Sequence, residues 1–162
     1  MPGATTAAMA GPARAAIAAA LPNLIVISAG GNDAAGIAFL WGSRRRAEIA
    51  ASAARIAGLA RVGQAAGARV VVLGLVPPVS QPWWRTALIG GRQGAAMAAI
   101  EAATRLPVGA VRMDVARLLG PDGRSDHLHF TPAAYARIDA ALAPYRAAAC
   151  AAQSQGAATA SS

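Results

Sequence analysis

Residues 24–33 read Leu-Ile-Val-Ile-Ser-Ala-Gly-Gly-Asn-Asp, an uncharged apolar run that ends in turn-forming and polar residues. Its β-branched first half is typical of a strand that is buried on both faces of a sheet. Two further apolar runs, at residues 70–76 and 108–113, have the same character. Ala-rich segments of helical length separate these runs. The alternation of strand and helix predicts a parallel sheet that is covered by helices.

The segments around the three strands predict four helices. They cover about residues 12–21, 44–66, 91–105 and 132–146. Pro12 is acceptable at the first position of its helix, and Thr131 followed by Pro132 is a typical helix start. Residues 79–90, which contain two adjacent tryptophans, are expected to form a loop.

A chain of 162 residues is expected to form one domain. We place this domain at residues 1–146. Residues 147–162 contain mainly Ala, Ser, Gln, Gly and Thr, with nothing large to bury, so we expect a disordered tail. The single cysteine, Cys150, excludes an internal disulfide and a cysteine metal cluster.

The net charge of +8 comes entirely from arginine, because the chain has no lysine. The arginines are scattered apart from residues 44–46, and no aromatic residues interleave with them, so we expect no nucleic-acid partner. Residues 15–32 carry no charge, but Pro22 and Asn23 interrupt the run, so we expect no membrane span. No signal peptide is recognisable, and the localisation stays open.

Residues 125–132 read Ser-Asp-His-Leu-His-Phe-Thr-Pro and carry a candidate acid–base pair. A histidine that acts as general base needs a partner on its other ring nitrogen, and Asp126 is close enough in sequence to serve His129 in this way. His127 is a rival base. The alternative interpretation is a helix-capping aspartate beside a surface histidine.

Asn32 follows the first strand, where loops cross the carboxyl edge of the predicted sheet. Open α/β sheets bind ligands at this edge. A side-chain amide there can donate a hydrogen bond to a developing oxyanion. The alternative is that Gly-Gly-Asn-Asp forms a simple turn, in which Asp33 caps the following segment.

Together these residues resemble the SGNH, or GDSL-type, ester hydrolase family. Ala-Gly-Gly-Asn-Asp at 29–33 is similar to the family's third block, and Asp-His-Leu-His at 126–129 is similar to its fifth. Residues 72–78 resemble the strand and proline turn between them. The resemblance implies a flavodoxin-like three-layer α/β/α sandwich, a triad containing Asp126 and His129, and no metal or organic cofactor. It also implies that the oxyanion is bound by Asn32 and by the backbone N–H of Gly3, in a Gly-Ala-Thr-Thr-Ala stretch that is similar to the second block.

The family's first block, a strand that ends in Gly-Asp-Ser, has no counterpart in this sequence. Ser28 is expected inside a strand and Ser52 within a helix, Ser43 adjoins the arginine run, and Ser80 follows a double proline. We therefore assign no nucleophile. The first strand or strands of the sheet are expected to be missing, which would leave residues 24–29 as an unpaired apolar edge. From this edge we expect poor solubility or self-association.

Three interpretations follow for the function. The first is a hydrolase of small-molecule esters whose sequence is truncated at its N-terminus; esterase, lysophospholipase, thioesterase and deacetylase activities all stay open. The second is a catalytically inactive remnant that binds a partner. The third, a nucleotide-binding module, is disfavoured because no Gly-rich phosphate loop follows the first strand. The aromatic residues Phe39, Trp41, Trp83 and Trp84 either line an acyl pocket or serve in packing.

Overall fold

The computed structural model describes residues 3–79, 83–89, 91–120, 123–125 and 129–159. Its elements are α1 (Thr6–Ala20), β1 (Leu24–Ile27), α2 (Gly31–Ile37), α3 (Gly42–Ala65), β2 (Arg69–Leu73), α4 (Trp83–Ile89), α5 (Arg92–Ala103), β3 (Val111–Met113), α6 (Val115–Leu119) and α7 (Pro132–Thr159). The strands form one parallel sheet in the order β1-β2-β3. The predicted α/β class with a parallel sheet is therefore confirmed.

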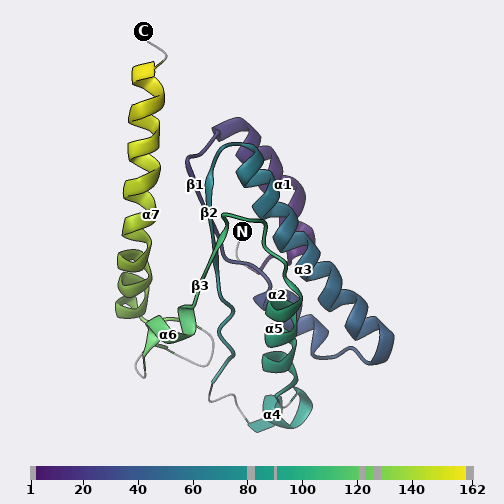
Figure 1. Ribbon diagram of the computed structural model, residues 1–162. Coiled ribbons are helices and arrows are strands. Elements are labelled where there is room, and N and C mark those ends of the chain that lie inside the picture. Colours follow the sequence, from purple (N-terminus) through teal and green to yellow (C-terminus); the bar gives the residue numbers. More distant parts are fainter. Residues whose placement is uncertain (1–2, 80–82, 90, 121–122, 126–128, 160–162) are drawn as a thin grey trace.

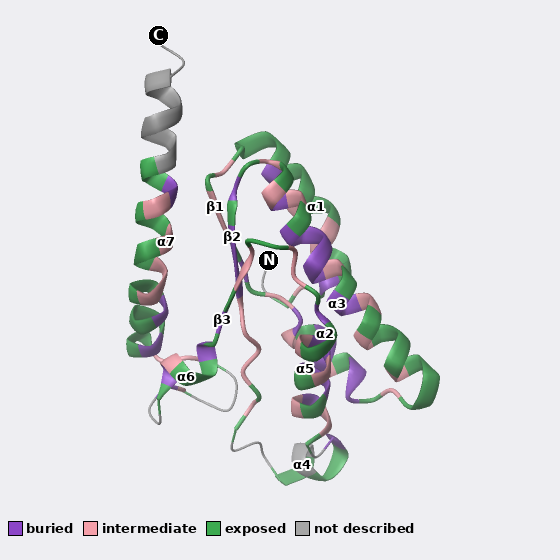
Figure 2. Cartoon of the chain, viewed as in Figure 1, coloured by how far each residue is buried: buried purple, intermediate pink, exposed green. Residues whose placement is uncertain are grey.

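Helices lie on both sides of the sheet. Figure 1 shows α1, α3 and α5 together on one side and α7 on the other. The main core joins the strands to α2, α3 and α5, and its largest members are Ile27, Ile37, Ile56, Leu59, Val70, Val72, Met97 and Ile100. A second cluster joins α6 to α7 through Val115, Leu119, Ala134 and Ile138. Figure 2 shows that the buried residues of α3 face the sheet and its outer face is exposed.

Gly63 allows α3 to approach the sheet closely. A Cβ atom at this position would lie 2.7 Å from Ile25 Cδ1 and 3.0 Å from Val70 Cγ2. Both distances are too short for ordinary van der Waals contact. Because glycine is unfavourable in a helix interior, its presence here is explained by the packing of α3 on β1 and β2.

β1 is an edge strand among the described residues, because it pairs with β2 alone. Its residue Val26 is 41% exposed. This arrangement agrees with the apolar edge expected from the sequence. Self-association through this edge stays a prediction.

Helix α1 begins at Thr6, six residues earlier than the sequence predicted. Thr5 caps it by accepting a hydrogen bond from the Ala8 N–H at 3.3 Å, and the helix continues through the exposed Pro12. A proline inside a helix removes one backbone hydrogen bond, so Pro12 was the wrong marker for the helix start.

Two other segments are more helical than the sequence predicted. α4 occupies residues 83–89, where a loop was expected. α7 continues to Thr159, through the stretch for which the composition suggested disorder. Alanine has the highest helix propensity of all residues, so an Ala-rich segment can stay helical without burying a face. The division into a domain at 1–146 and a tail at 147–162 stays a prediction.

No helix in the described part of the chain is both long and apolar enough to cross a membrane.

We expect Gly63→Ala and Gly58→Ala to have different effects although both replace a glycine in the interior of α3. A Cβ at Gly58 would meet only Arg14 and Arg61 side-chain nitrogens, at 3.8 and 3.9 Å. Gly58→Ala should therefore stabilise the protein by up to about 1 kcal/mol. Gly63→Ala should be less stable than Gly58→Ala by about 1–3 kcal/mol because of its overpacking. Urea denaturation of the two variants measures the difference, and equal stabilities would contradict the close packing of α3.

Candidate active site

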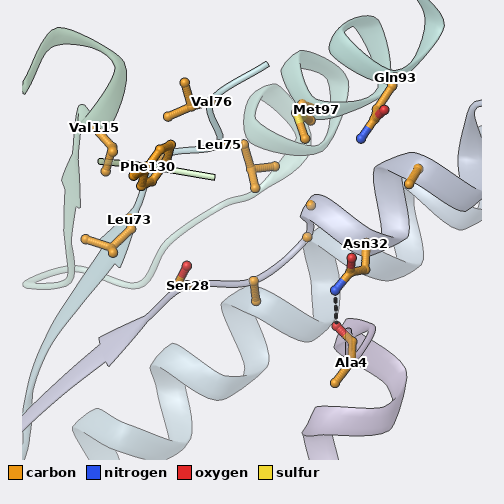
Figure 3. Close-up of a pocket in the computed structure, with 15 residues that line it drawn as sticks. Ala4, Ser28, Asn32, Leu73, Leu75, Val76, Gln93, Met97, Val115 and Phe130 are labelled. Carbon is orange, nitrogen blue, oxygen red and sulfur yellow. Dashed lines mark hydrogen bonds between the residues drawn. The ribbon is translucent and has the colours of Figure 1, made fainter. Parts of the chain in front are cut away.

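A pocket of about 380 Å³ lies at the carboxyl edge of the sheet. Its walls come from the segments that follow β1 and β2, from α5, and from the loop before α7. Figure 3 shows Phe130 and Val115 on one side of the lining side chains and Asn32 on the other. The walls are mainly apolar and include Leu73, Leu75, Val76, Met97, Val115 and Phe130. A concave, mostly apolar pocket with a few polar groups is the usual form of a small-molecule site.

The turn between β1 and α2 places Asn32 at this pocket. Gly30 has φ of +106°, a left-handed conformation that favours glycine, and forms the N-cap of α2. The Asn32 amide nitrogen donates to the carbonyl of Ala4 at 3.1 Å, which is drawn in Figure 3. A side-chain amide has two N–H donors, so one hydrogen remains for a ligand. Asn32 therefore contacts the N-terminal segment and also lines the pocket.

The buried Asp33 fixes this arrangement. One carboxylate oxygen accepts from the Thr6 N–H at 2.8 Å, and the other accepts from the Thr6 hydroxyl at 2.6 Å and the Ser52 hydroxyl at 3.0 Å. All three side chains are buried. The carboxylate thus joins α1, α2 and α3. The sequence suggested that Asp33 caps the segment that follows it; instead it accepts from the first residue of α1, which lies 27 positions earlier.

His129 lies on a short loop that is closed by backbone hydrogen bonds. Arg124 and Phe130 form an antiparallel bridge, and the His129 carbonyl accepts from the Ser125 N–H at 3.0 Å. The Thr131 hydroxyl accepts from the Ala134 N–H at 3.2 Å and so caps α7, as predicted. His129 itself is exposed, whereas its neighbour Phe130 lines the pocket.

Arg124 ties this loop to the segment after β2. Its guanidinium donates to the carbonyl of Val76 at 3.2 Å and to that of Pro77. The same group lies 5.5 Å from the centre of the Phe130 ring. These contacts hold Phe130 at the pocket wall, and nothing in the local sequence indicated them.

The predicted site residues have different outcomes. Asn32 lies at the pocket, and Gly3 is exposed beside Ala4, which lines the pocket. Asp126 and the rival base His127 lie outside the described residues. The catalytic roles of Asp126, His129, Asn32 and Gly3 stay predictions.

Two further polar residues line the pocket. Ser28, predicted inside a strand, lies one residue beyond the end of β1 and is exposed. Gln93 of α5 is buried, and its side-chain oxygen has no hydrogen-bond partner among the described residues. A buried amide without its partner is costly, so Gln93 marks a polar position in an apolar wall.

The described residues contain no cluster of three or more His, Cys, Asp or Glu that could hold a metal ion.

The four aromatic residues do not line this pocket. Phe39, Trp41, Trp83 and Trp84 are at least half exposed. The sequence offered an acyl pocket or ordinary packing as their role. The acyl-pocket role does not fit this pocket. Partial packing fits Phe39 and Trp84, which line a separate hollow, and Trp41, which lies against the Arg92 guanidinium.

We expect Asp33→Asn to destabilise the protein far more than the same change at Asp114. The substituted amide would place an N–H group against donors in a buried site, at a cost of about 3 kcal/mol. The exposed Asp114 only caps α6 by accepting from the Arg117 N–H, and asparagine caps equally well, so the cost should be below about 0.5 kcal/mol. Chemical denaturation of both variants measures this. Similar losses would show that the Asp33 contacts contribute little.

Comparison with known proteins gives a consistent assignment. A crystal structure of a GDSL-like lipase from Bacteroides thetaiotaomicron VPI-5482 superposes with a TM-score of 0.62 at 23% identity, over 90% of this chain and 73% of that chain. The crystal structure of TesA superposes with a TM-score of 0.48 at 25% identity, over 87% of this chain and 73% of that chain. The search among curated proteins found no match.

The first of these likenesses supports the fold. The sequence itself matches the model of the GDSL-like lipase/acylhydrolase family over residues 1–137. This range includes both the turn that carries Asn32 and the loop that carries His129. The resemblance found in the sequence is confirmed, and the chain belongs to the GDSL-like lipase/acylhydrolase family of ester-bond hydrolases.

Proposed function

We propose that this protein acts on acyl esters of small molecules through a Ser-His-Asp mechanism. In this mechanism a serine attacks the ester carbonyl, and His129 accepts the proton of that serine. Asp126 orients His129 and stabilises the imidazolium that forms. The N–H groups of Asn32 and Gly3 donate to the oxyanion of the tetrahedral intermediate. His129 then returns the proton to the leaving alcohol.

The position of Asn32 carries this proposal. Its amide lies at the pocket and donates to the Ala4 carbonyl, which fixes the orientation of the amide and supports a role as an oxyanion donor. Preorganised donors of this kind cost no rearrangement during the reaction. The loop that bears His129 reaches the same pocket through its neighbour Phe130.

The pocket walls suggest which part of the substrate is bound where. Leu73, Leu75, Val76 and Met97 form a continuous apolar surface on β2, the segment after it, and α5. Such a surface favours the acyl chain, because burial of each methylene contributes about 0.8 kcal/mol. The ester carbonyl would then lie toward Asn32.

The proposal assigns no nucleophile among residues 1–162. Ser28 lines the pocket, and for that reason it is the serine to test. A site that keeps its oxyanion hole but lacks its nucleophile still hydrolyses its substrate at a rate about 10³-fold above the uncatalysed rate. We therefore expect weak but real esterase activity from this chain.

The test is hydrolysis of p-nitrophenyl butyrate combined with fluorophosphonate labelling. Asn32→Ala should lower the residual kcat about 10²-fold, because it removes one oxyanion donor. His129→Ala should change the residual rate little, because without a nucleophile there is no serine proton for His129 to accept. Asn23→Ala is the matched control, since this exposed residue precedes β1 on the opposite edge of the sheet. Ser28→Ala should change neither the rate nor the labelling, which we expect to be absent.

One result would correct the proposal and another would contradict it. Fluorophosphonate labelling that Ser28→Ala abolishes would overturn the lack of an assigned nucleophile and identify Ser28 as the serine of this mechanism. A rate that equals the buffer rate, and that Asn32→Ala does not change, would instead favour the second interpretation, an inactive family member that binds a partner.

A further inference from the structure

Five large apolar side chains near the α4 end of the molecule are at least half exposed. Trp41 is 75% exposed, Trp83 81%, Trp84 50%, Phe39 62% and Leu88 69%. They include all three tryptophans of the chain. Figure 2 shows the first turn of α3 exposed, and Trp83, Trp84 and Leu88 of α4 are exposed as well. A contiguous exposed patch of this kind marks an interaction site.

The patch is continuous although it comes from separate segments. Phe39 lies in the α2–α3 connection, and it forms a hollow of about 260 Å³ with Trp84, Leu88 and Ile89 of α4. Among the side chains that the structure describes, the lining of this hollow is apolar. The two segments therefore present one apolar surface.

Arg92, at the start of α5, fixes the α2–α3 connection in place. Its guanidinium donates to the Leu40 carbonyl at 2.5 Å and lies 3.4 Å from the centre of the Trp41 ring. Arg45 donates to the carbonyls of Ile37 and Arg92, both at 3.3 Å. The exposed Trp41 is thus held by a cation–π contact and is not a loose side chain.

Positive charge borders this apolar surface. Arg44 and Arg46 are exposed near the start of α3. The first turn of this helix contains no acidic residue that would offset their positive charge. Glu48 is the nearest acidic residue along the helix, and it lies 3.9 Å from Arg55. The border therefore keeps an excess of positive charge.

We propose that this aromatic–arginine surface, made of Phe39, Trp41, Trp83, Trp84 and Leu88 with Arg44 and Arg46, docks on anionic lipid membranes. Tryptophan and phenylalanine favour the boundary between headgroups and acyl chains. Arginine near the bilayer surface is attracted by anionic headgroups. The surface combines these two chemistries in one place.

Charge and chemistry favour a membrane over other occupants. A second copy of the chain would bring two arginine clusters together, in a protein that already carries a net charge of +8. Sequence-specific contact with nucleic-acid bases needs polar partners for the base edges, and the described lining of the hollow consists of Phe39, Trp84, Leu88 and Ile89. An anionic bilayer supplies both the apolar phase and the negative charge.

Docking would also orient the pocket. α5 carries Arg92 beneath the surface and, on the same helix, Gln93 and Met97 in the pocket wall. The docked molecule would therefore hold its pocket near the bilayer. The inference itself concerns binding and does not depend on ester hydrolysis.

Vesicle binding of the full chain tests the proposal. Co-sedimentation with phosphatidylcholine vesicles that contain about one third phosphatidylglycerol should show binding that salt weakens, and pure phosphatidylcholine vesicles should bind far less. Because all three tryptophans lie in the surface, their emission should shift to shorter wavelength on binding. Lipids brominated near the headgroup should quench this emission.

Two double variants and their controls locate the binding surface. Arg44→Glu/Arg46→Glu and Trp83→Ser/Leu88→Ser should each lower the partition coefficient at least about tenfold. Arg61→Glu/Arg105→Glu and Leu21→Ser/Val108→Ser are the matched controls. They change the same net charge and remove as many apolar side chains, and all four residues are exposed and lie toward the amino edge of the sheet. These controls should bind as the unchanged protein does.

Several outcomes would overturn the proposal. These are equal binding to neutral and anionic vesicles, equal losses in the controls, or an unshifted tryptophan emission. Concentration-dependent dimerisation that Trp83→Ser/Leu88→Ser abolishes, without vesicle binding, would instead assign the surface to a second copy. Binding of a mixed-sequence RNA without vesicle binding would assign it to nucleic acid.

Discussion

The arrangement of the site depends on the hydrogen bonds that the buried Asp33 carboxylate accepts. They join the first residue of α1 to α2 and to the middle of α3. Hydrogen bonds to a buried charged group are stronger than those between neutral groups. Because Asn32 precedes Asp33, the same contacts bring its amide to the Ala4 carbonyl and to the pocket. One residue thus anchors the N-terminal segment and positions the candidate oxyanion donor.

Much of the fold could be predicted from the sequence, because the signals for its strands are local. Residues 24–27 and 70–73 are β-branched runs that become neighbouring strands. β2 is buried as expected, whereas β1 is only partly buried because it lies at the edge of the described sheet. The start of α1 could not be predicted, because Thr6 is held by an aspartate 27 positions away. α4 was missed because it is only seven residues long, too short for the spacing of Trp84 and Leu88 to stand out as a helical pattern.

The candidate site was predicted in outline, since both of its motifs lie on loops at the carboxyl edge of a parallel sheet. The sequence identified Asn32, and it correctly indicated that Thr131 caps α7. It did not indicate the exposure of Ser28, the contacts of Arg124 across 47 and 48 positions, or the buried Gln93. These features arise from contacts between distant segments, which no local pattern encodes.

The backbone N–H of Thr6 gives the most direct test of this central contact. The first N–H groups of a helix have no intrahelical partner and normally exchange quickly with solvent. Because Thr6 donates to Asp33 in a buried site, we expect its exchange to be slowed at least about a hundredfold, as for core amides. Native-state hydrogen exchange by NMR measures this rate. Exchange of the Thr6 amide at the rate of an unprotected peptide would contradict the role given to Asp33.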